Sequence, residues 1–181
     1  RAALLDIKLP ATLKSIGRNA FYRCYGLTQI TIPEGVTSIK DHSFYQCLSL
    51  KEIKLPSSLT EIQEYTFQEC KSLESIEFPA NITNISPGTF YSCLALQQVK
   101  FPANLNNISN YSFYQCTALE KANLPEGLTK IEYCAFYQCS GLKEVLFPST
   151  LATLEDQSFY RCSSLTEIAL PTSLTYCYRP F

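Results

Sequence analysis

The sequence predicts a solenoid, in which the chain winds through about seven similar coils that stack short parallel strands. Repeated prolines, cysteines and phenylalanines predict it, because each residue type recurs at the same interval of 23 residues. A fixed period of 20 to 50 residues is typical of stacked repeat architectures. The prolines of this series are Pro10, Pro33, Pro56, Pro79, Pro102, Pro125, Pro148 and Pro171.

Seven of the nine cysteines keep the same interval, and a phenylalanine precedes each of them by three residues. The cysteines are Cys24, Cys47, Cys70, Cys93, Cys116, Cys139 and Cys162. The phenylalanines are Phe21, Phe44, Phe67, Phe90, Phe113, Phe136 and Phe159. Since no unit is longer or shorter than the others, residues 1–181 form a single domain of about seven repeats plus a partial one.

Each unit opens with a segment that alternates between apolar and polar residues. In the unit after Cys24, the apolar residues are Leu27, Ile30 and Ile32, and Pro33 follows. Alternation is typical of a strand, and proline ends it because proline has no N–H to donate to a neighbouring strand. One short strand per coil is therefore expected, stacked in parallel on its neighbours about 4.8 Å apart.

The second half of each unit returns the chain to its starting side. A second short extended segment fits residues 37–40, and residues 41–46 have room for one helical or 3₁₀ turn. This turn would direct Phe44 and Cys47 into the core. The expected fold is therefore a β-rich α/β solenoid with one helical turn per repeat.

Composition excludes several classes of function. The chain has 15 basic and 16 acidic residues and a formal net charge of -1, so it lacks the basic surface of a nucleic-acid-binding protein. No run approaches the roughly 18 apolar residues of a membrane-spanning helix, so no direct membrane insertion is expected. With one histidine and no recognisable catalytic motif, we expect no enzyme activity and no cofactor.

The cysteines predict neither a metal site nor disulfides. Residues 23 apart form a row along one wall of a solenoid, which cannot surround an ion tetrahedrally. Neighbouring Cβ atoms near 4.8 Å also exceed the roughly 3.5 to 4.5 Å of a disulfide. We expect buried free thiols in this row, an exposed Cys134, a Cys177 in the core and a surface His42.

The repeat pattern resembles the BspA-like family of leucine-rich repeats, which residues 32–53 follow closely with Ser43 in place of alanine. The resemblance covers essentially the whole chain. It implies a secreted or cell-surface protein, and in several members an adhesin for host matrix proteins or other microbes. Arg1 occupies the cysteine position of a repeat, and the chain stops before the next phenylalanine, so we expect an excerpt of a longer array.

A stripe of tyrosines directly follows the inward phenylalanines. Two interpretations stand: the rings contact a protein or sugar, or they pack across the grooves between coils. The stripe consists of Tyr22, Tyr45, Tyr91, Tyr114, Tyr137 and Tyr160, with Gln68 at the remaining position.

The outward residues of the strands form the main candidate binding surface, because repeat proteins of this shape expose variable side chains there. Opposite charges fall side by side at Lys51 and Glu74, Glu120 and Lys143, and Lys121 and Glu144. These pairs are equally consistent with a solvated sheet that compensates its own charge. The candidate residues are Lys51, Glu52, Lys54, Glu74, Glu77, Gln97, Gln98, Lys100, Glu120, Lys121, Asn123, Lys143 and Glu144.

These observations predict a noncatalytic recognition module of the adhesion type that binds a protein or glycan, such as a host matrix or other cell-surface protein. The alternative is a structural spacer or stalk that displays other domains at the cell surface.

Overall fold

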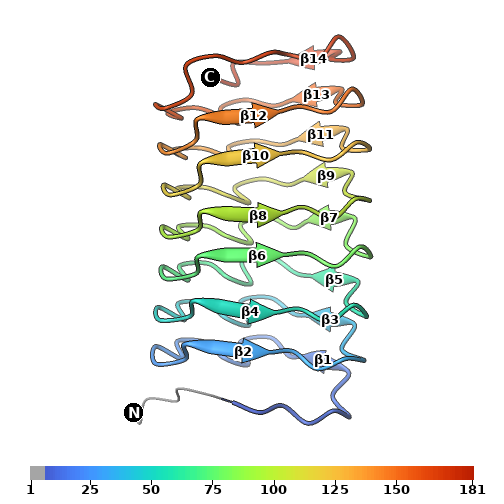
Figure 1. Ribbon diagram of the computed structural model, residues 1–181, viewed down its shortest axis with the longest axis vertical. Coiled ribbons are helices and arrows are strands. Elements are labelled where there is room, and N and C mark those ends of the chain that lie inside the picture. Colours follow the sequence, from blue (N-terminus) through green and yellow to red (C-terminus); the bar gives the residue numbers. More distant parts are fainter. Residues whose placement is uncertain (1–6) are drawn as a thin grey trace.

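The computed structural model describes residues 7–181, and these residues form fourteen short strands in a single stack of coils (Figure 1). Every strand pairing is parallel, and each paired residue lies 23 positions from its partner, as Ile30 does from Ile53. The predicted solenoid of about seven coils is therefore confirmed, and its axis is nearly straight (Figure 1).

The first ladder holds strands of three residues with the middle side chain turned inward. These strands are β2 (Gln29–Thr31), β4 (Glu52–Lys54), β6 (Ser75–Glu77), β8 (Gln98–Lys100), β10 (Lys121–Asn123) and β12 (Glu144–Leu146). They join in pairs, β2 with β4, β6 with β8, and β10 with β12. We call the outward surface of this ladder the strand face.

The second ladder, formed by the return segments, holds strands of two residues. They are β1 (Ser15–Ile16), β3 (Ser38–Ile39), β5 (Glu61–Ile62), β7 (Asn84–Ile85), β9 (Asn107–Ile108), β11 (Lys130–Ile131), β13 (Thr153–Leu154) and β14 (Tyr176–Cys177). These strands correspond to the second extended segment expected at residues 37–40. They join as β1-β3-β5 and as β14-β13-β11-β9-β7.

The expected helical or 3₁₀ turn is wrong, because the described residues contain no helix. Residues 41–46 form consecutive tight turns, in which His42 and Gln46 have left-handed backbones with φ of 53° and 55°. A helix needs φ near −60° at every residue, so these two positions interrupt it. The same two positions of every complete coil are left-handed, with φ between 52° and 61°.

Hydrogen bonds between coils compensate for this unusual backbone. In one coil, the N–H groups of His42, Phe44 and Gln46 donate to Glu64, Thr66 and Gln68 of the next coil at 3.2, 2.9 and 2.8 Å. The intervening residues close turns within the coil, as when Tyr45 N–H donates to the carbonyl of His42. A left-handed conformation costs a non-glycine residue about 1–2 kcal/mol, which these bonds offset.

We call the side of the stack that carries the tight turns of residues 41–46 and their equivalents the turn side. Its core is a continuous stack of phenylalanine rings. The centroids of successive rings from Phe21 to Phe159 lie 4.9 to 5.5 Å apart, with interplanar angles of 7° to 18°. All but Phe21 are buried. One ring per coil at a fixed position therefore joins each coil to the next.

The in-register thiols lie beside this stack, and each from Cys47 to Cys162 donates to the backbone of the preceding coil. Cys93 Sγ lies 3.1 Å from the carbonyl oxygen of Phe67, and Cys116 Sγ lies 3.3 Å from that of Phe90. All nine cysteines are free thiols. The row is buried from Cys47 onward, whereas Cys24 is half-buried.

The two expectations for the out-of-register cysteines are wrong. Cys134 is buried, because its turn is packed between Tyr111 and Gln157 of the neighbouring coils. Cys177 is exposed, because β14 pairs on one side only, with β13.

The left-handed turn predicts a specific dependence on residue type at Gln138, whose φ is 56°. We expect Gln138→Val to be less stable than Gln138→Gly by about 1–2 kcal/mol, because a β-branched residue disfavours this conformation. Both variants remove the same side-chain amide, so the lost hydrogen bond from Gln115 cancels in their difference in urea denaturation. Equal stability of the two variants would show that the turn imposes no such constraint.

Burial predicts which thiols react in the folded chain. Burial raises the pKa of Cys93, Cys116 and Cys139, and that of Cys162 to about 12, so little thiolate is present there at pH 8. We expect iodoacetamide to modify Cys177 rapidly and these four only after unfolding, as measured by peptide mass spectrometry. Cys177→Ser is the control that should abolish the rapid reaction, and rapid modification of native Cys116 would contradict the expectation.

Candidate interaction surface

The strand face presents the predicted residues outward. Twelve of the thirteen candidate side chains are exposed, and Glu144 is half-buried. The period-two geometry of each strand places the middle residue, such as Ile53 or Ile76, in the core and its two neighbours in solvent. The exposed residues therefore lie on a rigid frame whose inward side is fully packed.

Ion pairs on the strand face follow the strand pairs. Lys121 Nζ lies 2.8 Å from Glu144, and Lys143 Nζ lies 3.2 Å from Glu120, so both of these expected pairs are present. Hydrogen bonding to Glu144 raises the pKa of Lys121. Lys100 pairs with Glu77. The expected pair of Lys51 with Glu74 is absent, although both residues lie within the described part of the chain.

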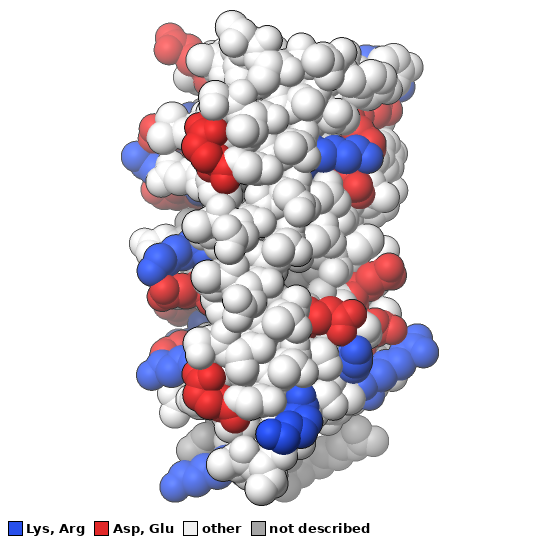
Figure 2. Space-filling model, turned by 90° about the vertical axis from the view of Figure 1, so that its right-hand side faces the viewer, with Lys and Arg blue, Asp and Glu red and all other residues white. Residues whose placement is uncertain are grey.

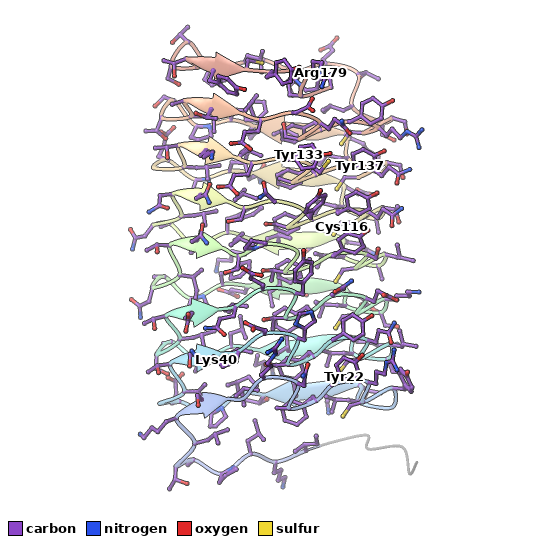
Figure 3. All side chains as sticks on the ribbon, turned by 180° about the vertical axis from the view of Figure 1, so that it is seen from behind. Tyr22, Lys40, Cys116, Tyr133, Tyr137 and Arg179 are labelled. Carbon is purple, nitrogen blue, oxygen red and sulfur yellow. The ribbon has the colours of Figure 1, made fainter. Side chains whose placement is uncertain are left out.

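The tyrosine stripe forms stacked rings on the turn side. Tyr22 and Tyr45 stack at 4.9 Å, and Tyr91, Tyr114, Tyr137 and Tyr160 follow at centroid distances of 4.5, 4.8 and 5.5 Å. Tyr22 and Tyr137 lie along the same edge of the stack in Figure 3.

This stacking limits what the stripe can bind. Both faces of the Tyr114 ring are covered, by Tyr91 and by Tyr137, which leaves its edge and hydroxyl for solvent. A sugar ring that stacks on tyrosine needs a free ring face. The geometry therefore favours the structural interpretation, in which the rings pack against neighbouring coils.

A second polar row runs beside the tyrosines, and the sequence analysis did not identify it. Arg23 Nε donates to Gln46 at 2.9 Å, Gln46 donates to Glu69 at 3.2 Å, and Gln115 donates to Gln138 at 2.9 Å. In the sequence, this row is visible as a recurring polar residue directly before each in-register cysteine. That residue occupies the second left-handed position of the coil. These bonds link successive coils.

His42 lies on the turn side, as expected for a surface histidine, but it is half-buried. Its ring stacks on Tyr65 at 5.4 Å, and Tyr65 in turn covers Gly88. A Cβ at Gly88 would lie 2.2 Å from the Tyr65 ring, so glycine makes room for this tyrosine. The contacts give His42 a packing role.

Residues 7–181 contain no group of three or more histidine, cysteine or acidic residues arranged for a metal ion. The same residues include no helix long and apolar enough to cross a membrane. On the side with the proline turns, acidic and basic side chains are interspersed and neither sign forms a large patch (Figure 2).

The family model for the BspA type leucine rich repeat region matches this chain in six copies, over residues 1–120 and 83–179. A search of curated proteins gives no significant match to this sequence.

Three solved structures share the fold. A leucine-rich repeat protein of T. pallidum is 28% identical with a TM-score of 0.84, and the match covers 90% of this chain and 78% of that one. One from Bacteroides ovatus is 26% identical with a TM-score of 0.72, covering 94% and 52%. A leucine rich cell surface protein of Faecalibacterium prausnitzii, 22% identical with a TM-score of 0.59 and covering 98% and 70%, shows the fold alone. This chain therefore spans about half of the B. ovatus chain.

The tyrosine stack predicts a loss of stability at alkaline pH. Burial raises the pKa of Tyr91 and Tyr114. Outside the stripe, a hydrogen bond with Cys134 raises the pKa of Tyr133 to about 12. Unfolded tyrosines ionise near pH 10, so the unfolded chain releases protons first. The stabilisation is complete below about pH 10 and falls as the pH rises through the folded pKa values.

We expect urea midpoints to fall between about pH 10 and 12, and the double variant Tyr91→Phe with Tyr114→Phe to reduce that fall. The control variant Tyr176→Phe alters an exposed tyrosine outside the stripe. A pH dependence identical in wild type and the double variant would show that the stripe does not contribute.

Proposed function

Because this chain belongs to the family of BspA-type leucine-rich repeat proteins, we propose that it is a noncatalytic recognition module that binds a partner protein through its strand face. Leucine-rich repeat domains generally bind proteins or act at surfaces, and such families are typically noncatalytic scaffolds. The observation that carries the proposal is the contrast between the two sides of each strand. Inward residues are committed to the core, whereas the outward ones are exposed and differ from coil to coil.

Rigidity supports this use of the strand face. The strands are fixed by hydrogen bonds and by the stacked core, so a partner does not have to order them on binding. Preorganisation lowers the entropic cost of association, which allows many individually weak polar contacts to add up. The interspersed charges favour a partner with a polar surface of mixed sign over a polyanion.

A surface location and an adhesive role extend this proposal. The family resemblance implies secreted or cell-surface proteins, so the candidate partners are host matrix proteins, other cell-surface proteins and their glycans. A role as a spacer or stalk is the alternative. The ion pairs of Lys121 with Glu144 and of Lys143 with Glu120 favour it, because the two opposite charges of each pair already neutralise each other. The two functions differ in whether the identity of the outward residues matters.

The test replaces the outward residues of three strands with serine and leaves the inward ones unchanged. The residues are Lys51, Glu52 and Lys54, then Gln97, Gln98 and Lys100, then Lys143, Glu144 and Leu146. Binding to immobilised fibronectin, laminin and collagen is measured by biolayer interferometry. We expect at least one of these proteins to bind wild type, and this variant to bind it at least tenfold more weakly, because the contacts made by the outward side chains are lost.

The control variant carries serine at exposed residues of the turn side, Tyr25, Leu48, Lys71 and Leu94, and should bind as wild type does. Circular dichroism and thermal unfolding confirm that both variants are folded. Unchanged binding by the strand-face variant would refute recognition through this surface and favour the spacer.

A further inference from the structure

The polar row of the turn side has one residue in each coil, directly before the in-register cysteine. These residues share the left-handed backbone, with φ of 58° at Arg23 and 61° at Arg161, so their side chains leave the turns in the same direction. The labelled Tyr137, which precedes Gln138, marks this part of the turn side in Figure 3. The row consists of Arg23, Gln46, Glu69, Ser92, Gln115, Gln138 and Arg161.

Hydrogen bonds run along the polar row from each coil to the next. The first chain of bonds starts at Arg23 and ends on the carboxylate of Glu69, which accepts. The second chain starts at the hydroxyl of Ser92, which donates to Gln115 at 3.0 Å, and Gln115 Nε2 then donates to Gln138 Oε1 at 2.9 Å. The first chain therefore ends on an acceptor, whereas the second ends on an amide whose Nε2 is still a donor.

The next residue of the row beyond this amide is Arg161, whose guanidinium carries donors only. Among residues 7–181, neither the Nε2 of Gln138 nor the guanidinium of Arg161 has a hydrogen-bond acceptor. Two sets of donors thus adjoin without an acceptor between them. This part of the row can satisfy its donors only with water or with an oxygen-bearing ligand.

Arg161 differs in this respect from Arg23, its equivalent in another coil. Both guanidinium groups lie over the ring of the preceding tyrosine, Arg23 at 5.1 Å from the centroid of Tyr22 and Arg161 at 5.6 Å from that of Tyr160. Arg23 has an acceptor in Gln46, whereas the described residues supply none to Arg161. The two arginines therefore share a setting and differ in whether a partner is present.

A pocket of about 390 Å³ lies where these donors meet. This volume falls within the range of about 300–1,000 Å³ that is typical of ligand sites. All the residues that line the pocket are polar and none of them is acidic, so no negative charge in the lining repels an anion. They are Gln115, Thr117, Gln138, Ser140, Arg161 and Ser163.

Short side chains account for the space in the pocket. The position directly after the in-register cysteine holds large residues in the first four coils, Tyr25, Leu48, Lys71 and Leu94, whereas Thr117, Ser140 and Ser163 occupy it in the next three. Within residues 7–181, the hydroxyls of Ser140 and Ser163 have no protein partner. Hydroxyls both donate and accept, so the pocket combines a cationic group with groups that suit other hydroxyls.

The carboxylates nearest to this pocket along the turn side are used elsewhere. Asp156 lines a neighbouring hollow together with Arg161, but it pairs with Arg179 at 3.1 Å. Glu69, the acidic member of the polar row, lies two coils before Gln115. An anion that enters the pocket therefore meets an arginine without a competing carboxylate.

We propose that this pocket binds an acidic sugar residue, whose carboxylate or sulfate accepts hydrogen bonds from Arg161 and Gln138. A guanidinium presents parallel N–H donors that fit an oxyanion, and such charge-assisted bonds are stronger than neutral ones. The hydroxyls of Ser140 and Ser163 match the hydroxyls of the sugar. The site lies on the turn side, so it is independent of the partner protein proposed for the strand face.

An acidic peptide fits the pocket less well. The backbone N–H groups of this wall are already used, because Gln138 N–H donates to the carbonyl of Tyr160 and Ser140 N–H donates to that of Gln138, both at 2.8 Å. A peptide backbone would therefore meet side-chain amides and hydroxyls only. No apolar residue lines the pocket to hold the aliphatic part of an acidic side chain.

The test titrates the ¹⁵N-labelled chain with a hyaluronan tetrasaccharide, whose acidic groups are carboxylates, and follows backbone amide and arginine Nε–H signals by NMR. We expect saturable shifts at Gln138, Ser140 and Arg161. A keratan sulfate tetrasaccharide, which carries sulfate and no uronate, shows in a second titration which oxyanion binds more tightly. Neutral chitotetraose should give no saturable shift at these residues.

Two variants remove the cationic site in different ways. Arg161→Gln deletes the charge, and Gln138→Glu places an internal carboxylate beside Arg161 with little change in size. Each should raise the dissociation constant at least about tenfold, because a charge-assisted pair with the ligand is lost. Arg23→Gln is the matched control, since it changes the net charge by the same amount at an equivalent position, and it should bind within about twofold of wild type.

Unchanged amide spectra outside the polar row confirm that each variant is folded. The absence of saturable shifts with both acidic tetrasaccharides would overturn the proposal, as would equal affinity of Arg161→Gln and wild type. Equal weakening by Arg23→Gln and Arg161→Gln would overturn it as well, because the attraction would then follow net charge and not the pocket. Binding of a tetraglutamate peptide without binding of either acidic sugar would assign the pocket to acidic peptides instead.

Discussion

The hydrogen bond from the backbone of one coil to the backbone of the next is the interaction on which the structure depends. A coil of 23 residues is too short to satisfy its own N–H and carbonyl groups, and buried unpaired groups are costly. On the turn side, N–H groups such as those of His42, Phe44 and Gln46 donate to the coil that follows. Each coil is therefore stable only in register with its neighbours.

Register in turn determines the side-chain rows. Because equivalent residues lie directly above one another, phenylalanine stacks on phenylalanine, tyrosine on tyrosine, and each in-register thiol from Cys47 to Cys162 reaches the equivalent carbonyl of the preceding coil. Fully buried phenylalanines contribute on the order of 1.5–3 kcal/mol each. The same regularity places a tyrosine ring on each side of Tyr114 and of Tyr137, which favours a packing role for these two rings.

Departures from regularity are the places where the surface acquires individual chemistry. Ala122 replaces the larger inward residue of other coils, and the neighbouring step of the strand face loses its hydrogen bonds. Gly88 accommodates the ring of Tyr65, which in turn stacks on His42. The space that Gly88 leaves is filled from within the chain by the ring of Tyr65. A repeat protein can vary its surface in this way without changing its fold.

The sequence by itself determined the period, the strands, the inward rows of phenylalanine and cysteine, and the outward direction of the thirteen strand-face residues. All of these follow from residue spacing within one coil. Only the tertiary structure decided the left-handed turns at positions such as His42 and Gln46, because polar residues there are equally compatible with a helical turn until the next coil supplies its carbonyls. It also decided the burial of Cys134 and the exposure of Cys177, since each depends on the fit between neighbouring coils.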